Sequence, residues 1–338
     1  MRDNDEEKQG RIFQIRRILV PVDFSEGSRC ALAFAARLGS SANSEEERPK
    51  LQIVHGVKAF GAPLRRVLFP YAPLGEDDRE LEAEVVEAAR EEVGRYFSLD
   101  EREELRLVGP PVVEVIPRER QVGHWLEGLD SDLIAMGAFG EGGAFCAGPG
   151  STARRVVAGA SQPVALLRSF DPGATIRRVL VAWEPGHLGE RVMEVGMRLA
   201  FDLDAPLSFL HVFRAPRRHS VRWNQAPWSG VKREELREQL GLRLRALFEE
   251  SLKAVDLPYA DEGRRGEMSE LTLEIGEPAD RIGEVAQQEG ADLVVVGRGG
   301  SAAERTGRVG PVASAVMARV PRHVVVVPGR LNSESLLD

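Results

Sequence analysis

A glycine-rich stretch follows the apolar residues 132–136. It contains Gly137, Gly140 and Gly150, with nine residues between the last two, and Ser151 follows directly. A glycine has no Cβ, so its backbone N–H can approach an anion closely, and the free N–H groups at a helix start carry partial positive charge. Ser151 can cap a helix or donate its hydroxyl to a phosphate oxygen. The spacing therefore indicates a site for a di- or triphosphate.

A carboxylate, Asp23, ends the first apolar segment of the chain. It can accept a hydrogen bond from a ribose hydroxyl or an adenine amino group, and Pro21 and Val22 beside it offer an apolar surface to a base. The structural alternative is that Asp23 or Ser25 caps the helix that follows. Both interpretations of the carboxylate stay open from these residues alone.

The chain contains two copies of one pattern. Residues 17–23 resemble residues 178–184, and residues 131–137 resemble residues 291–297. Nearly the same number of residues separates the two pieces in each copy, which a chance similarity would not preserve. Proline and glycine interrupt the chain between the copies, in residues 169–174. The sequence therefore predicts a tandem duplication.

Each copy alternates short apolar segments with segments of helical periodicity. This alternation predicts an α/β fold made of two tandem doubly wound, Rossmann-like domains, each with a five-stranded parallel sheet and crossover helices. Such sheets bind ligands outside the carboxyl ends of their strands, where the strand order reverses. The strands expected in the first copy are residues 17–22, 51–57, 112–116, 132–137 and 163–168.

The domain boundaries follow from the repeat. A chain of 338 residues exceeds the length of one ordinary domain. The predicted divisions are a disordered N-terminal leader (1–14), a first domain (15–168), a linker (169–175), a second domain (176–328) and a C-terminal tail (329–338).

Composition and charge argue against several classes of function. The chain has 43% hydrophobic and 29% charged residues, a net charge of −8, and two cysteines, Cys30 and Cys146. These values favour a globular cytoplasmic protein without a disulfide framework or a metal cluster. No apolar run approaches the ~20 residues that span a bilayer, so no membrane association is expected. Residues 214–233 are basic and contain tryptophan, but the acidic balance favours an ordinary loop over a nucleic-acid site.

The glycine spacing and the segment that ends at Asp23 resemble the universal stress protein family. Its ATP-binding members carry a glycine, two residues, a glycine, nine residues, and then a glycine with Ser or Thr, which Gly137, Gly140, Gly150 and Ser151 match. The resemblance covers residues 15–168 and 176–328. It implies an HUP-type fold and binding of ATP, AMP or ADP, with or without Mg²⁺.

The resemblance also implies roles for single residues. Asp23 takes the position of the contact to adenine and ribose, beside Pro21 and Val22, and Gly56 replaces a valine whose backbone meets adenine. The segment implied to wrap ribose and phosphates comprises Met136, Gly137, Gly140, Gly150, Ser151 and Thr152. The family further implies that the last strands, 163–168 and 323–327, pair within one chain, and it leaves a homodimer of chains open.

The second copy departs from this pattern. Glu184 replaces Asp23, Trp183 could fill the space of a base, and Pro311 replaces Ser151, which removes an N–H and a hydroxyl. The glycine spacing itself recurs at Gly297, Gly300 and Gly310. We therefore expect one working nucleotide site, in the first copy.

These inferences predict a nucleotide-gated regulatory protein of the stress response with an unidentified protein partner. No Walker lysine follows the glycines and no general base lies beside them, so no catalytic residue is assigned. We expect ATP hydrolysis to be weak at most. The alternatives are a scaffold that acts through protein contacts without a nucleotide, and a slow ATPase.

Overall fold

The computed structural model describes residues 13–38, 48–58, 77–96, 107, 109–116, 122–139, 148–168, 175–214, 233–255, 268–299 and 308–329. Contacts divide the chain into two compact units, residues 15–174 and residues 1–14 with 175–338. Gly140, Gly300, most of the predicted leader, linker and C-terminal tail, and Cys146 lie outside the described residues.

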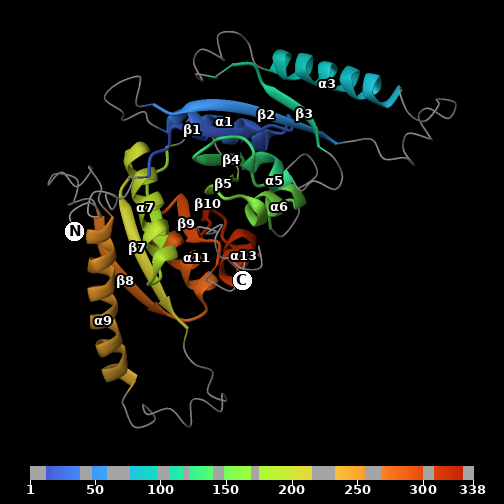
Figure 1. Cartoon of the computed structure of the whole chain (residues 1–338). Helices are drawn as coiled ribbons and strands as arrows, with labels where there is room; N and C mark the ends of the chain where they lie inside the picture. Colours follow the sequence, from blue (N-terminus) through green and yellow to red (C-terminus); the bar gives the residue numbers. More distant parts are fainter. Residues whose placement is uncertain are drawn as a thin grey trace, which may run out of the picture. The chain divides into compact units, whose positions relative to one another are not determined.

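The first unit has the predicted doubly wound topology. Its described strands follow the order β3-β2-β1-β4-β5, and each neighbouring pair is parallel. The order reverses between β1 and β4, so their carboxyl ends border the crevice in which such sheets bind ligands. The elements are β1 (Arg17–Pro21), α1 (Glu26–Arg37), β2 (Lys50–Lys58), α3 (Asp77–Tyr96), β3 (Val112–Ile116), α5 (Val122–Glu127), β4 (Leu133–Gly137), α6 (Ser151–Gly159) and β5 (Val164–Leu167) (Figure 1).

The second unit repeats this topology. Its described strands follow the order β10-β9-β6-β7-β8, again with parallel pairs, and the order reverses between β6 and β9. The tandem α/β fold is thereby confirmed. The elements are β6 (Val179–Ala182), α7 (His187–Asp202), β7 (Leu207–Phe213), α9 (Arg233–Ala254), β8 (Met268–Ile275), α11 (Pro278–Gln288), β9 (Leu293–Gly297), α13 (Pro311–Arg319) and β10 (His323–Val327) (Figure 1).

Continuous apolar runs form the central strands because helices cover both faces of such a sheet. In β4, Leu133, Ile134 and Ala135 are fully buried, and the same holds for Leu293, Val294 and Val295 in β9. Phe13, which precedes β1, belongs to the second unit, where its N–H donates to the carboxylate of Glu194 at 2.7 Å.

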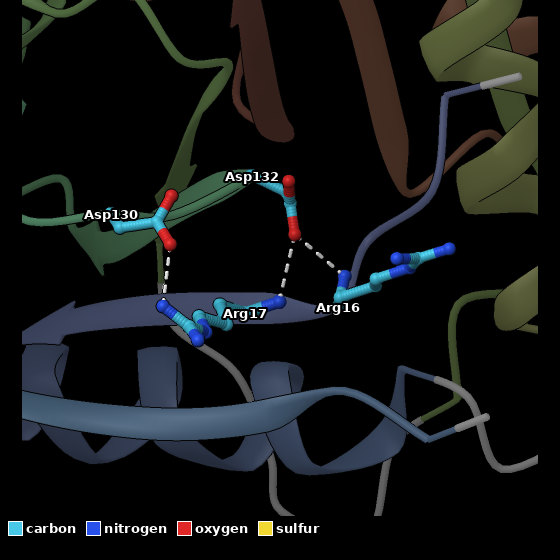
Figure 2. Close-up of polar contacts among 4 residues, drawn as sticks. All are labelled: Arg16, Arg17, Asp130 and Asp132. Atoms are coloured by element: carbon cyan, nitrogen blue, oxygen red, sulfur yellow. Dashed lines mark hydrogen bonds and ion pairs between the residues drawn. The ribbon is translucent and has the colours of Figure 1, made fainter. Parts of the chain in front are cut away.

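An aspartate fastens the amino ends of the central strands in the first unit. The Oδ2 of Asp132 accepts hydrogen bonds from the backbone N–H groups of Arg16 and Arg17 at 2.8 and 2.9 Å. Figure 2 shows the Asp132 carboxylate facing these two N–H groups, with Asp130 paired to the Arg17 guanidinium. The start of β1 is therefore held beside the start of β4.

Asp292 does the same in the second unit, with more bonds. Its Oδ2 accepts from the backbone N–H of Arg177 at 2.8 Å and from Nε at 3.1 Å, and its Oδ1 accepts from Nη2 at 3.1 Å. Partial burial by itself would raise the pKa of Asp292, but the hydrogen bonds and charge of Arg177, with the charge of Arg322, lower that pKa overall. We call Asp132 and Asp292, with the arginines that they bind, the amino-end clamps.

Candidate functional site

The site in the first unit begins with a hydrogen-bonded cluster between β1 and α1. The Oδ1 of Asp23 accepts from the hydroxyls of Ser25 and Ser28, both at 2.5 Å, and from the Ser25 N–H at 3.2 Å. Ser25 is the N-cap of α1, where its Oγ accepts from the Ser28 N–H. The capping interpretation holds for Ser25, which Asp23 supports, and the contact of Asp23 to a nucleoside stays a prediction. All these bonds use Oδ1, so the second carboxylate oxygen of the exposed Asp23 receives none of the bonds found among the described residues.

The backbone between Asp23 and Ser25 has an uncommon conformation. Phe24 has φ +64°, in the left-handed region that non-glycine residues seldom adopt. Its ring lies 4.9 Å from that of His55, centroid to centroid, and His55 Nδ1 lies 2.7 Å from the carbonyl oxygen of Val22. His55 is therefore bound to the backbone at the end of β1 and fixes the turn into α1.

Gly137 has a packing reason to be glycine. A Cβ at Gly137 would lie 2.8 Å from the carbonyl carbon of Gly27 and 2.9 Å from its Cα. Gly27 in turn has room only for hydrogen, because its Cβ would lie 2.7 Å from the carbonyl oxygen of Phe139. The first turn of α1 thus packs backbone to backbone against the end of β4. The glycine spacing noted in the sequence reflects this contact as well as any ligand.

The helix α6 starts beside the same strand end. Gly150 is its N-cap, without a side-chain hydrogen bond, and the Gly150 N–H donates to the carbonyl oxygen of Ala138 at 2.8 Å. Ser151 and Thr152 are exposed in the first turn. The N–H groups of a first turn have no acceptor within their own helix. The start of α6, with its partial positive charge, therefore lies beside the end of β4, through the bond of Gly150 to Ala138.

Most of the remaining residues predicted to contact the nucleotide are buried. Val22 is 4% exposed and Met136 is 6% exposed, so neither presents a broad apolar face, whereas Pro21 is half-buried. A Cβ at Gly56 would lie 2.2 Å from Cδ1 of Ile116, so the isoleucine already occupies the space of a valine side chain there.

The sequence reasoning missed the roles of Gly27, Phe24 and Ser28. Ser28 lies three residues after the N-cap Ser25, about one helical turn away, so its side chain can reach back to Asp23 at the strand end. That spacing was the available signal for Ser28. The role of Gly27 depends on a contact with β4, far away in the sequence, and had no local signal.

The second unit replaces the three serines of this arrangement. Gly186 is the N-cap of α7, with φ +115° and no side-chain hydrogen bond, where the first unit has Ser25. Gly189 takes the position of Ser28, and a Cβ there would lie only 1.6 Å from the carbonyl oxygen of Glu184. Pro311 is the first residue of α13. The departures that the sequence shows therefore extend to the start of both helices that border this crevice.

A pocket of about 450 Å³ lies at the carboxyl ends of β6, β7 and β9. Its walls are mainly apolar, with Glu184 and His211 as the titratable groups among the described lining residues. His211 Nδ1 lies 3.0 Å from the carbonyl oxygen of Trp183 and is thereby bound to the backbone. The lining residues are Ala182, Trp183, Glu184, Leu188, Gly189, Val192, Leu210, His211, Val212, Pro278, Ile282, Val296, Gly297, Gly299, Gly310, Pro311, Val312 and Ala313.

The described residues form neither a metal cluster nor a membrane-spanning helix. Within the described part of the chain, no three His, Cys, Asp or Glu side chains are grouped so that they could hold a metal ion. No helix in the described ranges has both the length and the apolar character needed to cross a bilayer.

The comparison with solved structures supports the fold. A universal stress protein from Archaeoglobus fulgidus DSM 4304 is 17% identical, with a TM-score of 0.55 over 94% of this chain and 97% of that chain. A functionally unknown protein from Pseudomonas aeruginosa PAO1 is 16% identical, with a TM-score of 0.56 over 94% of each chain. At these identities the likeness shows the fold alone. No curated protein matches the chain.

The family model settles the relationship. The model described as the universal stress protein family matches the chain twice, at residues 14–168 and 175–328. These matches correspond to the two repeats and leave only short segments outside them. The chain is therefore a tandem, two-domain member of the universal stress protein family.

Proposed function

We propose that the first unit binds an adenine nucleotide, with ATP as the first candidate, and that binding regulates contact with a protein partner. The observation that carries the proposal is the start of α6 beside the end of β4. Gly150 leaves the first-turn N–H groups without a side-chain cap, and Ser151 adds an exposed hydroxyl. A helix start with free N–H groups and a glycine before it is suited to phosphate oxygens.

The second contribution comes from Asp23. Its Oδ1 is engaged by Ser25 and Ser28, which fixes the carboxylate in place. Asp23 follows the carboxyl end of β1, at the reversal of strand order, and its Oδ2 can accept from a ribose or adenine group. In this proposal the start of α6 binds the phosphates and Asp23 binds the nucleoside.

Regulation would follow from the segment between Gly140 and Gly150. Phosphate contacts at Gly137, Gly140, Gly150 and Ser151 would favour one arrangement of residues 141–149, and a partner would recognise that arrangement. The pairing of residues 163–168 with 323–327, a homodimer and a cytoplasmic location stay predictions. Hydrolysis is not required by this proposal.

The test is calorimetric titration of ATP into the full chain, comparing wild type with Ser151→Pro. Proline is compatible with this position, because Gly150 has φ −58° and ψ 163° and the second unit places Pro311 after a glycine with φ −63° and ψ 159°. The change removes one N–H and one hydroxyl of the protein that would otherwise donate hydrogen bonds to the charged phosphates. We expect ATP affinity to fall by about tenfold to a hundredfold.

Two further variants sharpen this test. Asp23→Asn keeps an oxygen for Ser25 and Ser28 but removes the charge, and we expect it to weaken ATP binding with little loss of stability. Pro311→Ser makes the reciprocal change in the second unit and should leave the ATP affinity of the first unit as it is. No ATP binding by wild type, or equal binding by wild type and Ser151→Pro, contradicts the proposal.

A further inference from the structure

We propose that the pocket of the second unit binds an uncharged, flat aromatic compound that carries one hydrogen-bond acceptor. This inference is independent of nucleotide binding in the first unit. A pocket of about 450 Å³ lies in the range of small-molecule sites, which are mainly apolar with a few polar groups that fix orientation. Its place at the reversal of strand order, between β6 and β9, is where a doubly wound sheet binds ligands.

The walls of the pocket disfavour a phosphate. Pro311 begins α13 and offers neither an N–H nor a hydroxyl. Glu184 lines the same pocket and is exposed, so its carboxylate repels an anion at the opening. Leu188 lies at the position that Gly27 has in the first unit and adds apolar surface. Glu184 and Pro311 thus disfavour an anion, and the mainly apolar walls favour an uncharged ligand over a charged one.

The shape of the pocket suits a flat ring. Gly189, Gly297, Gly299 and Gly310 all contribute to the lining, and a glycine lets a ring approach the backbone closely. Gly189 in particular cannot be replaced, because of its contact with the Glu184 carbonyl oxygen. Ring side chains from Trp183 and His211 border the same space, and aromatic ligands pack well against them.

Trp183 supplies the hydrogen-bond donor that the acceptor of the ligand would meet. Its side chain is 2% exposed, and its Nε1–H has no acceptor among the described residues. Nε1 lies 3.3 Å from the position of a Cβ on Gly189, so the N–H is at a wall of the pocket. A buried donor without a partner is unfavourable, and a ligand with an acceptor at this wall would satisfy it.

The experiment uses two probes of matched shape, 2-acetylnaphthalene and 2-ethylnaphthalene. Both are titrated into the full chain labelled with ¹⁵N-tryptophan, and the indole N–H signals are followed by NMR. The Trp183 signal is assigned by its loss in Trp183→Phe. We expect the ketone to shift the Trp183 signal in a saturable way and to bind about threefold to tenfold more tightly than the ethyl compound. In Trp183→Phe this difference between the two probes should vanish.

Two variants of α13 distinguish binding in the pocket from binding at the protein surface. Val312→Trp places a large side chain in the pocket and should weaken the ketone about tenfold or more. Ser314→Trp, on the exposed side of α13, should bind the ketone as wild type does. Circular dichroism checks that both chains are folded.

Three results would overturn the inference. One is the absence of saturable ketone binding by wild type. Another is equal binding of the ketone and ethyl compounds by wild type, since the indole N–H would then have no role. The third is displacement of the ketone by ATP in the Ser151→Pro chain, which would make the second pocket a nucleotide site.

Discussion

The two units share a strand order and differ at the edge where that order reverses. In the first unit, Asp23, Ser25 and Ser28 form a closed polar cluster at the start of α1. In the second unit, Gly186 and Gly189 stand at the corresponding positions of α7, and an apolar pocket opens beside them. The same fold thus presents a polar, fixed rim in one copy and an apolar hollow in the other.

This difference shows that the glycine spacing does not by itself define a phosphate site. Gly137 and Gly297 occupy equivalent positions, but Gly137 meets the backbone of Gly27 and Gly297 meets the side chain of Leu188. The glycines keep a helix close to a strand in both units. The groups around them, above all Ser151 and Pro311, decide what the crevice can bind.

The largest effect should come from adding a methyl group at Gly137, with the same change at Gly297 as its comparison. In Gly137→Ala the new Cβ meets backbone atoms that cannot move separately, and we expect a loss of about 2–3 kcal/mol in the free energy of unfolding. In Gly297→Ala the Cβ meets Cδ2 of Leu188 at 2.8 Å, and this flexible end can turn away. A loss below about 1 kcal/mol is expected there. Urea unfolding measures both, and equal losses would contradict the distinction.

The amino-end clamp of the second unit should give the next largest effect. Asp292→Ala removes one backbone and two guanidinium hydrogen bonds, and we expect unfolding to become easier by about 1.5–3 kcal/mol. Thermal unfolding of the purified chain measures this loss. Glu250→Ala, at an exposed position in α9, is the control that should change little.

The same clamp predicts a dependence on pH. The pKa of Asp292 is lower in the folded chain than its ordinary value of 3.8. Its stabilising contribution is therefore fully present above pH 3.8 and is lost as the pH falls through the lowered folded value. Asp292→Asn should flatten this part of the curve of stability against pH. An identical acid dependence for wild type and variant would exclude the clamp as its cause.

A smaller effect is expected at the two N-caps. Ser25→Ala removes the capping hydroxyl of α1 and should reduce the free energy of unfolding by about 1 kcal/mol. Placing a serine at the N-cap of α7 should not stabilise the second unit in return, because Gly186 has φ +115° and a serine there would be strained. Gly186→Ser should therefore destabilise the chain by about 1–2 kcal/mol, although serine is a better cap in general. A stabilised Gly186→Ser chain would contradict this reason for the glycine.

The smallest effect should come from the exposed ion pair of the first clamp. Arg17→Met removes the pair with Asp130 but keeps the backbone N–H that binds Asp132. Because both side chains of the pair are exposed, we expect a change below about 0.5 kcal/mol, reduced further by salt. Thermal unfolding at low and high salt measures it.

The fold was predictable because apolar strands and their spacing are local properties. The runs that became β1 and β4, and their repeats β6 and β9, are continuous and short, as buried parallel strands must be. The site was predictable in part, since Gly150 and Ser151 do begin a helix beside the end of β4.

The rest depended on contacts between distant segments. The approach of Gly27 to Gly137 joins residues that are far apart in the sequence, and neither glycine reveals its partner. The pocket of the second unit is lined by residues far apart in the sequence, such as Gly189 in α7 and Pro311 in α13. Such volumes follow from how elements pack, which local patterns do not contain.

The amino-end clamps have a consequence for how a duplicated protein can change. Each copy carries its own fastening, Asp132 or Asp292, at the end of the sheet opposite its crevice. Substitutions at the crevice of one copy therefore leave both fastenings untouched. In a duplicated chain of this kind, substitutions can change the ligand specificity of one crevice while the clamps keep both sheets intact.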